Sequence, residues 1–275
     1  MLQTADPVTH RGPGVPAGDA GPARFVAALL ADFDLGQAME DLRYCDRGYR
    51  SPGGPGYEAA LERLAERLRA AGFGSDPRLR MRFLETRIDH AVWIPRSASL
   101  VLRCTDQAPR VLHAFAHASD RDRTMLPLYA PSADVEGRPV FTLGDVAPGT
   151  VLVTEAKLFQ SLLRRAEQRG AVAVLSSNLF PFTQDPTGRE RHLDAILFTK
   201  VSPGTSFPVA QISPRVRTFI REAADETDAW LALTAHVEEG EPVVRTLVAE
   251  IVGARRPEEA IAIVSHVQEP GAGDN

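Results

Sequence analysis

The stretch GTVLVTEAKLFQSLLRRAEQRGAVAVL, residues 149–175, decides the fold expected for this chain of 275 residues. It begins and ends with short apolar runs, 149–154 and 171–175, that are typical of buried strands. Apolar residues between the runs recur at helical spacing, and Gly170 is placed to end that helix: Leu158, Phe159, Leu162, Leu163 and Ala166. Such a strand–helix–strand unit makes its two strands parallel, with a right-handed crossover. The sequence therefore predicts an α/β fold.

Further strands are expected on both sides of this unit. Segments 91–94, 99–104, 111–116 and 140–142 alternate apolar and polar residues between turn-forming residues. Residues 178–206 read as a long loop, and 207–212 as another strand. Ser213 and Pro214 then provide an N-cap and a first-turn proline for a helix to about residue 224.

The residues before the strands are expected to be helical. Residues 1–21 are rich in Gly and Pro and predict a disordered leader. A helix is expected from Pro22, with an apolar stripe of Phe25, Val26, Leu29, Leu30 and Phe33. The clearest helix covers residues 57–71, and Gly72 suits the left-handed position that ends it. Its apolar face consists of Leu61, Leu64, Ala65 and Leu68.

Composition excludes several functional classes. A net charge of −5 gives no general attraction to nucleic acid or to acidic membranes. No apolar run approaches the roughly 18 residues of a membrane span, and the first twenty residues lack a signal-peptide core, so the expected location is cytoplasmic by default. Cys45 and Cys104 are too few for a disulfide framework and are expected as separate thiols or as one disulfide.

Most histidines and acidic residues have no motif around them. Gly-x-Ser-x-Gly, Walker, Rossmann and paired CxxC patterns are missing from the sequence, which argues against serine hydrolase, NTPase and dehydrogenase functions. His113 and His117 share an HxxxH spacing without the glutamate of a zincin, in a segment that reads as strand. We expect both to be solvated strand histidines. The remaining histidines and acidic candidates are interpreted as isolated side chains or solvated loop charges: His90, His192, His236, Asp185, Asp194, Glu238 and Glu239.

The carboxyl-terminal segment carries the one candidate site. After an acidic break at residues 225–228, segments 230–236, 243–251 and 261–266 predict three antiparallel strands. The last strand leads into His266, and a Pro/Gly turn separates this histidine from Asp274. Imidazole and carboxylate suit zinc, and the carboxyl end of a strand is a common place for such a site. By spacing alone this pair is a weak signal.

A resemblance strengthens that signal. Arg245-Thr-Leu-Val-Ala-Glu-Ile-Val-Gly253, Ile261-Ala-Ile-Val-Ser-His266 and Gly271-Ala-Gly-Asp-Asn275 resemble the start of the catalytic domain in the M28 family of zinc aminopeptidases. The resemblance implies two Zn²⁺ ions, with His266 as a ligand of one and Asp274 as the bridging ligand. It also implies a peptide or aminoacyl substrate, hydrolysed with the help of the metals.

The chain departs from the family pattern at two points. Gln268 stands where the family has an aspartate that orients the histidine, so weaker metal binding is expected. The family's catalytic glutamates and later ligands correspond to positions beyond residue 275. We therefore expect an amino-terminal fragment that is inactive alone. The alternative is a non-catalytic binding or lid module of a degenerate homologue.

The resemblance also predicts a domain order. The runs "GTVLV", "AEQRGAVAVL" and "FPVAQIS" are similar to a protease-associated domain. The expected order is a leader (1–21), an amino-terminal helical segment (22–92), a protease-associated-like domain (93–224) and the start of the catalytic domain (225–275). The inserted domain would thus separate the helical segment from the first antiparallel strands of a truncated mixed-sheet zinc exopeptidase domain.

Overall fold

The computed structural model describes residues 22–183 and 192–269, and it divides into two compact units, residues 1–41 and 42–275. The first unit holds α1 (Pro22–Asp32) and the start of α2 (Leu35–Asp46). Asp34 caps α2, since its Oδ1 accepts a hydrogen bond from the Gln37 amide at 2.9 Å. The expected apolar stripe of α1 is present and exposed.

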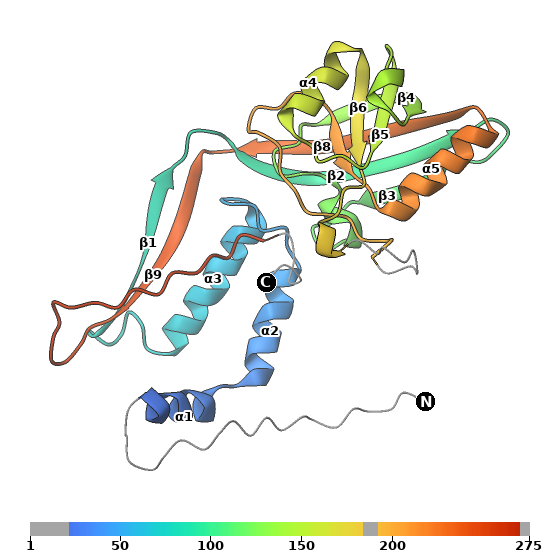
Figure 1. Ribbon diagram of the computed structural model, residues 1–275. Coiled ribbons are helices and arrows are strands. Elements are labelled where there is room, and N and C mark those ends of the chain that lie inside the picture. Colours follow the sequence, from blue (N-terminus) through green and yellow to red (C-terminus); the bar gives the residue numbers. More distant parts are fainter. Residues whose placement is uncertain (1–21, 184–191, 270–275) are drawn as a thin grey trace, which may run out of the picture. The chain divides into compact units, whose positions relative to one another are not determined.

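The second unit contains the other elements (Figure 1). Its long elements are α3 (Pro55–Ala70), β1 (Leu79–Arg87), β2 (Val92–Cys104), β3 (Arg110–Phe115), β4 (Ala133–Val140), β5 (Thr150–Thr154), α4 (Gln160–Gln168), β6 (Ala171–Ser176), β7 (Val209–Gln211), α5 (Pro214–Glu226), β8 (Ala229–Gly240) and β9 (Val243–Ile251). Short 3₁₀ turns lie at Arg121–Met125, Leu143–Asp145 and Pro181–Thr183. The fold is α/β with a mixed sheet.

Seven strands form the main sheet in the order β3-β2-β8-β4-β5-β6-β7. The pairs β3–β2, β2–β8 and β8–β4 are antiparallel, whereas β4–β5, β5–β6 and β6–β7 are parallel. The predicted crossover is confirmed as β5, α4 and β6. Its strands are buried on both faces because α4 and the loops cover them, which explains their continuous apolar runs.

Two glycines allow close approach around the crossover. A Cβ atom at Gly137 on β4 would lie 2.5 Å from the carbonyl oxygen of Gly149. Gly170, with φ of 90°, ends α4 and approaches Pro148 so closely that a Cβ atom would lie 2.8 Å from the Pro148 Cα. The α5 start also agrees with the sequence, because the Ser213 hydroxyl accepts from the Val216 amide.

The strands β1 and β9 pair antiparallel, from Leu79 opposite Ile251 to Arg87 opposite Val243. The strands β2 and β8 continue this pairing from Val92 opposite Gly240, so one two-stranded ladder leads from the small sheet into the large one (Figure 1). The Ile88 amide bridges the interruption by donating to the Pro242 carbonyl. Everything between β1 and β9 is therefore inserted between two paired strands.

Helix α3 packs against β9 through a polar anchor. The Tyr57 hydroxyl donates to the Arg245 carbonyl at 2.7 Å. The Arg245 guanidinium donates to Glu58 and Glu62 at 2.8 and 3.0 Å and lies over the Phe83 ring at 3.7 Å. Gly72 follows the helix with φ of 96°, as the sequence predicts.

Strand β8 lies between β2 and β4 in the large sheet. The prediction of a strand at 261–266 is wrong: Ile261, Ile263 and Val264 are 92–96% exposed and have no strand partner among the described residues. Alternation of apolar and polar residues is not enough to form a strand, because the backbone N–H and C=O groups also need hydrogen-bond partners on a neighbouring strand.

None of the described helices combines the length and apolarity that crossing a bilayer requires.

Candidate functional site

His266 lies in an irregular segment that follows β9. Its imidazole is half-exposed, and Nδ1 lies 3.3 Å from Oε1 of Glu269. Nε2 makes no hydrogen bond within the described residues, and a carboxylate beside Nδ1 is a common feature of metal-binding histidines. Gln268 is exposed and makes no polar contact within the described part of the chain. The position of Asp274 lies outside the described residues.

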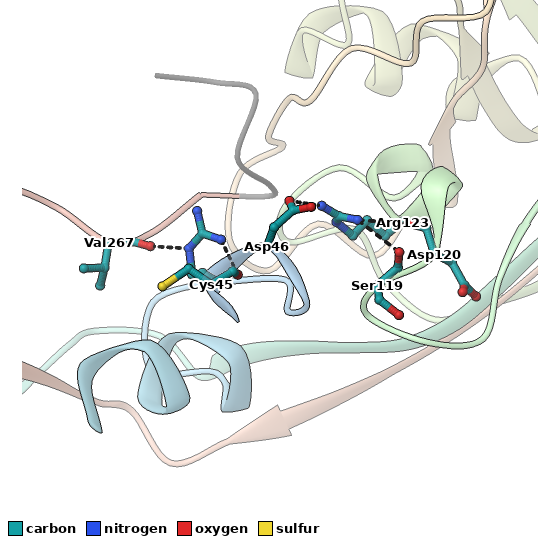
Figure 2. A network of polar contacts seen from close by, with 7 residues as sticks. Cys45, Asp46, Ser119, Asp120, Arg123 and Val267 are labelled. Carbon is teal, nitrogen blue, oxygen red and sulfur yellow. Dashed lines mark hydrogen bonds and ion pairs between the residues drawn. The ribbon is translucent and has the colours of Figure 1, made fainter. Parts of the chain in front are cut away.

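Arg50 holds the segment that follows His266. Its side chain is buried, Nε donates to the Val267 carbonyl at 2.7 Å and Nη1 donates to the Cys45 carbonyl at 2.5 Å. The Arg50 amide also donates to the Glu269 carbonyl at 3.0 Å. Figure 2 labels Val267 and Cys45, whose carbonyl oxygens accept these two hydrogen bonds. These contacts fix the backbone on both sides of Gln268.

Arg123 provides a second anchor in the same region (Figure 2). Its guanidinium donates to Asp46 at 2.9 Å and to the carbonyl groups of Ser119 and Asp120 at 3.3 Å. The side chain is only 12% exposed, so this ion pair is partly shielded from water. Sequence reasoning missed Arg50 and Arg123, because nothing in the local pattern distinguishes them from the many surface arginines.

The donor set of the described residues fits zinc only in part. The Glu269 carboxylate near Nδ1 of His266 corresponds to the negatively charged neighbour that zinc-binding histidines commonly have. However, no group of three His, Cys, Asp or Glu side chains gathers anywhere in residues 22–183 and 192–269. A catalytic zinc takes three protein ligands. Ligands from outside the described residues are needed to complete a site.

His113 is buried on β3, so the prediction that it is solvated is wrong. Its Nδ1 lies 3.0 Å from Oδ2 of Asp122, and its Nε2 accepts a hydrogen bond from the Ser213 amide at 3.1 Å. Partial burial acts to raise the pKa of Asp122, but hydrogen bonds from His113 and Ala114 and nearby positive charge outweigh it and hold that pKa below its usual value. The Ser213 hydroxyl caps α5, so these residues form a structural link and not a nucleophilic triad.

A second histidine contact lies where the ladder enters the large sheet. His90 Nδ1 lies 2.6 Å from Asp89, and Nε2 lies 3.0 Å from the Tyr129 hydroxyl. Tyr129 has φ of 68°, which bulky residues rarely adopt. Burial, followed by the charge of Asp89, raises the pKa of Tyr129, so its hydroxyl stays protonated and is a poor nucleophile.

Of the remaining candidates, His192 and Asp194 line one surface cavity together with Asp122. His117, His192 and His236 are exposed. Asp194 pairs with Arg215 at 2.8 Å and Glu238 with Arg96 at 2.6 Å, and Glu239 is exposed on β8. Asp185 lies outside the described residues. Cys45 and Cys104 are not joined by a disulfide.

Comparison with known proteins finds solved structures whose backbones are similar to that of this chain over part of their length. No family model matches the chain, and no curated protein matches it. One similar solved structure is an aminopeptidase from Aneurinibacillus sp. strain AM-1, with a TM-score of 0.42, 13% identity, and coverage of 78% of this chain and 47% of that protein. Another is a Peptidase M28 precursor from Shewanella amazonensis SB2B, with a TM-score of 0.48, 15% identity, and coverage of 82% and 51%. The chain spans about half the length of these two structures.

Proposed function

We propose that residues 243–275 form one part of the two-zinc site of an M28-like aminopeptidase that acts on peptides or aminoacyl substrates. The observation that carries the proposal is the contact between His266 and Glu269, in a segment whose sequence resembles the zinc-binding start of that family. Arg50 supports it by holding the backbone at Val267 and Glu269.

Each residue has a distinct role in this proposal. His266 would hold one zinc through Nε2, and the Glu269 carboxylate, 3.3 Å from Nδ1, would supply a stabilising negative charge beside the ring. Asp274 would supply a further carboxylate ligand. Bound zinc would polarise the scissile carbonyl and activate water. Gln268 carries no charge, and in this arrangement Glu269 provides the carboxylate that the family pattern places at position 268.

One imidazole and one bridging carboxylate are fewer ligands than a catalytic zinc takes. We therefore propose that this polypeptide alone binds zinc weakly and does not cleave peptides, as an incomplete amino-terminal fragment. The test is dialysis of the purified 275-residue chain against buffer with trace zinc, followed by metal analysis and an aminoacyl-nitroanilide assay. Loss of zinc and no cleavage support the proposal. Stoichiometric zinc with cleavage contradicts it.

The second candidate function is a binding module without catalysis. The large sheet favours it, because the sheet is built independently of His266 and has cavities along its edges.

A further inference from the structure

The strongest unassigned feature is a cavity of about 230 Å³ beside the ends of the parallel strands β5, β6 and β7. These strands end at Thr154, Ser176 and Gln211, and in open parallel sheets ligands bind outside the carboxyl ends of strands. Figure 1 shows α4 beside β5 and β6 in this part of the sheet. The cavity is lined by Lys157, Leu158, Phe159, Asn178, Phe180, Leu197, Phe198, Thr199, Lys200 and Gln211.

Both lysines of the chain line this one cavity. Lys157 and Lys200 are exposed, and no ion pair involves either of them within the described residues. Among the described residues, no aspartate or glutamate lines this cavity, although the whole chain carries a net charge of −5. The cavity is therefore a local positive site on an acidic protein, and it suits an anionic group.

The backbones that carry these lysines are held in place. The segment of Lys200 pairs with Leu128, since the Leu128 amide donates to Thr199 and the Val201 amide donates to Leu128. Before Lys157, the Ala156 amide donates to the Thr154 hydroxyl, and the Ser176 hydroxyl donates to the Ala156 carbonyl. The two cations thus extend from ordered turns, which lowers the entropic cost of binding.

Two side-chain amide oxygens in the cavity lining accept no hydrogen bond from the described residues. Gln211 is 1% exposed, and its Oε1 has no hydrogen-bond partner among the described residues. The same is true of Asn178 Oδ1, whose amide is oriented by Nδ2 donating to the Glu155 carbonyl at 3.1 Å. Buried acceptors normally have partners, so an N–H donor from a ligand would complete this site.

The cavity also has an apolar wall. Phe159 and Phe180 are 63% and 41% exposed, and Leu158, Leu197 and Phe198 also line the cavity. Exposed aromatic rings beside fixed polar groups are typical of small-ligand sites. A ligand here meets cations, hydrogen-bond acceptors and apolar surface together.

We propose that this cavity binds an apolar N-acyl amino acid, the chemical form of a peptide's carboxyl terminus. The carboxylate pairs with Lys157 and Lys200, the amide N–H donates to Oε1 of Gln211, and the side chain packs on Phe159 and Phe180. The site lies in the large sheet and does not depend on the proposed zinc chemistry.

The test is an NMR titration of the ¹⁵N-labelled 275-residue chain with three probes: N-acetyl-leucine, its carboxamide and 4-methylpentanoate. We expect N-acetyl-leucine to bind with a Kd on the order of 1 mM and to shift amides of residues 157–160, 176–178 and 197–200. Its carboxamide lacks the charge and 4-methylpentanoate lacks the N–H, and each should bind about tenfold more weakly. Equal Kd values for N-acetyl-leucine and its carboxamide, or shifts elsewhere on the protein, would overturn the proposal.

Variants separate this site from a general anion site. The exposed double variant K157Q/K200Q should remove the difference between N-acetyl-leucine and its carboxamide, and Q211L should remove the difference between N-acetyl-leucine and 4-methylpentanoate. R164Q, an exposed change on α4 outside the lining, is the control and should bind as the unmodified chain does. Unchanged Kd values in K157Q/K200Q, or inorganic phosphate binding as tightly as N-acetyl-leucine, would contradict the assignment.

Discussion

The imidazole of His266 lies 3.3 Å from the carboxylate of Glu269, while Gln268 between them is turned to solvent. The family pattern predicts the orienting group at position 268. In the structure, the charged neighbour of the imidazole comes from one residue further along the chain. Glu269 is largely shielded from water, and such a carboxylate orients a histidine more firmly than an exposed amide can.

This relationship predicts a difference between two neighbouring substitutions. E269Q should weaken zinc binding to the chain by about tenfold, because the imidazole loses the negative charge beside Nδ1. Q268A should leave the affinity unchanged. Competition of the chain with a zinc-sensitive dye measures both values. The reverse order, with Q268A the weaker binder, would show that the amide at position 268 orients the histidine.

Arg50 should control the order of the segment after His266. The variant R50M removes two side-chain hydrogen bonds to carbonyl groups, and we expect it to lower the free energy of unfolding by about 1–3 kcal/mol. It should also speed hydrogen exchange of the amides at residues 266–269. R47Q, at an exposed neighbouring position, is the matched control. Similar exchange in R50M and R47Q would argue against the role assigned to Arg50.

Asp122 gives the stability a defined pH dependence. Because the pKa of Asp122 is lower in the folded protein, the ionised carboxylate stabilises the fold above its ordinary pKa of about 3.9. That contribution is lost as the pH falls through the folded-state pKa. The unfolding free energy of D122N should therefore decrease less steeply than that of the unmodified chain between about pH 5 and pH 3.

Denaturant unfolding at several pH values tests this prediction. D134N, which changes an exposed aspartate on β4 without a recorded partner in the described residues, is the control and should keep the original slope. Identical slopes for D122N and D134N would mean that the contact with His113 does not shift the titration.

Arg245 should anchor α3 to the small sheet. R245M keeps much of the apolar stem but loses two ion pairs and the contact with the Phe83 ring, so we expect a loss of about 1–2 kcal/mol in stability. R82M, on an exposed position of β1, should cost less than about 0.5 kcal/mol. Thermal unfolding compares the two. An equal loss of stability in R245M and R82M would contradict the proposed role of Arg245 in anchoring α3.

The sequence predicted those features whose signal is local. Residues 149–175 carry two buried strands, a helix and its terminal glycine in one continuous stretch, and the structure has all of them. The cap at Ser213 and the left-handed Gly72 depend on neighbouring backbone groups and were also predictable.

Features that depend on distant partners were not predictable. The alternation of β8 fits any half-buried sheet, and only its register opposite β2 and β4 assigns it to the large one. His113 looks like a surface histidine until Asp122 and Ser213, nine and a hundred residues away, reach it. The apolar segment before His266 alternates like a strand but has no partner among the described residues. Sequence periodicity indicates which face of a strand or helix can be buried, but it does not identify the element that packs against that face.

The central claim is that His266 and Asp274 bind zinc, and a cobalt titration tests it most directly. Co²⁺ reports imidazole and carboxylate ligation through its visible spectrum, and zinc displaces it from the same ligands. We predict weak cobalt binding by the 275-residue chain that H266A and D274N each reduce by at least about tenfold, with H236A, at an exposed histidine on β8, unchanged. Equal cobalt binding by the unmodified chain, H266A and D274N would contradict the account.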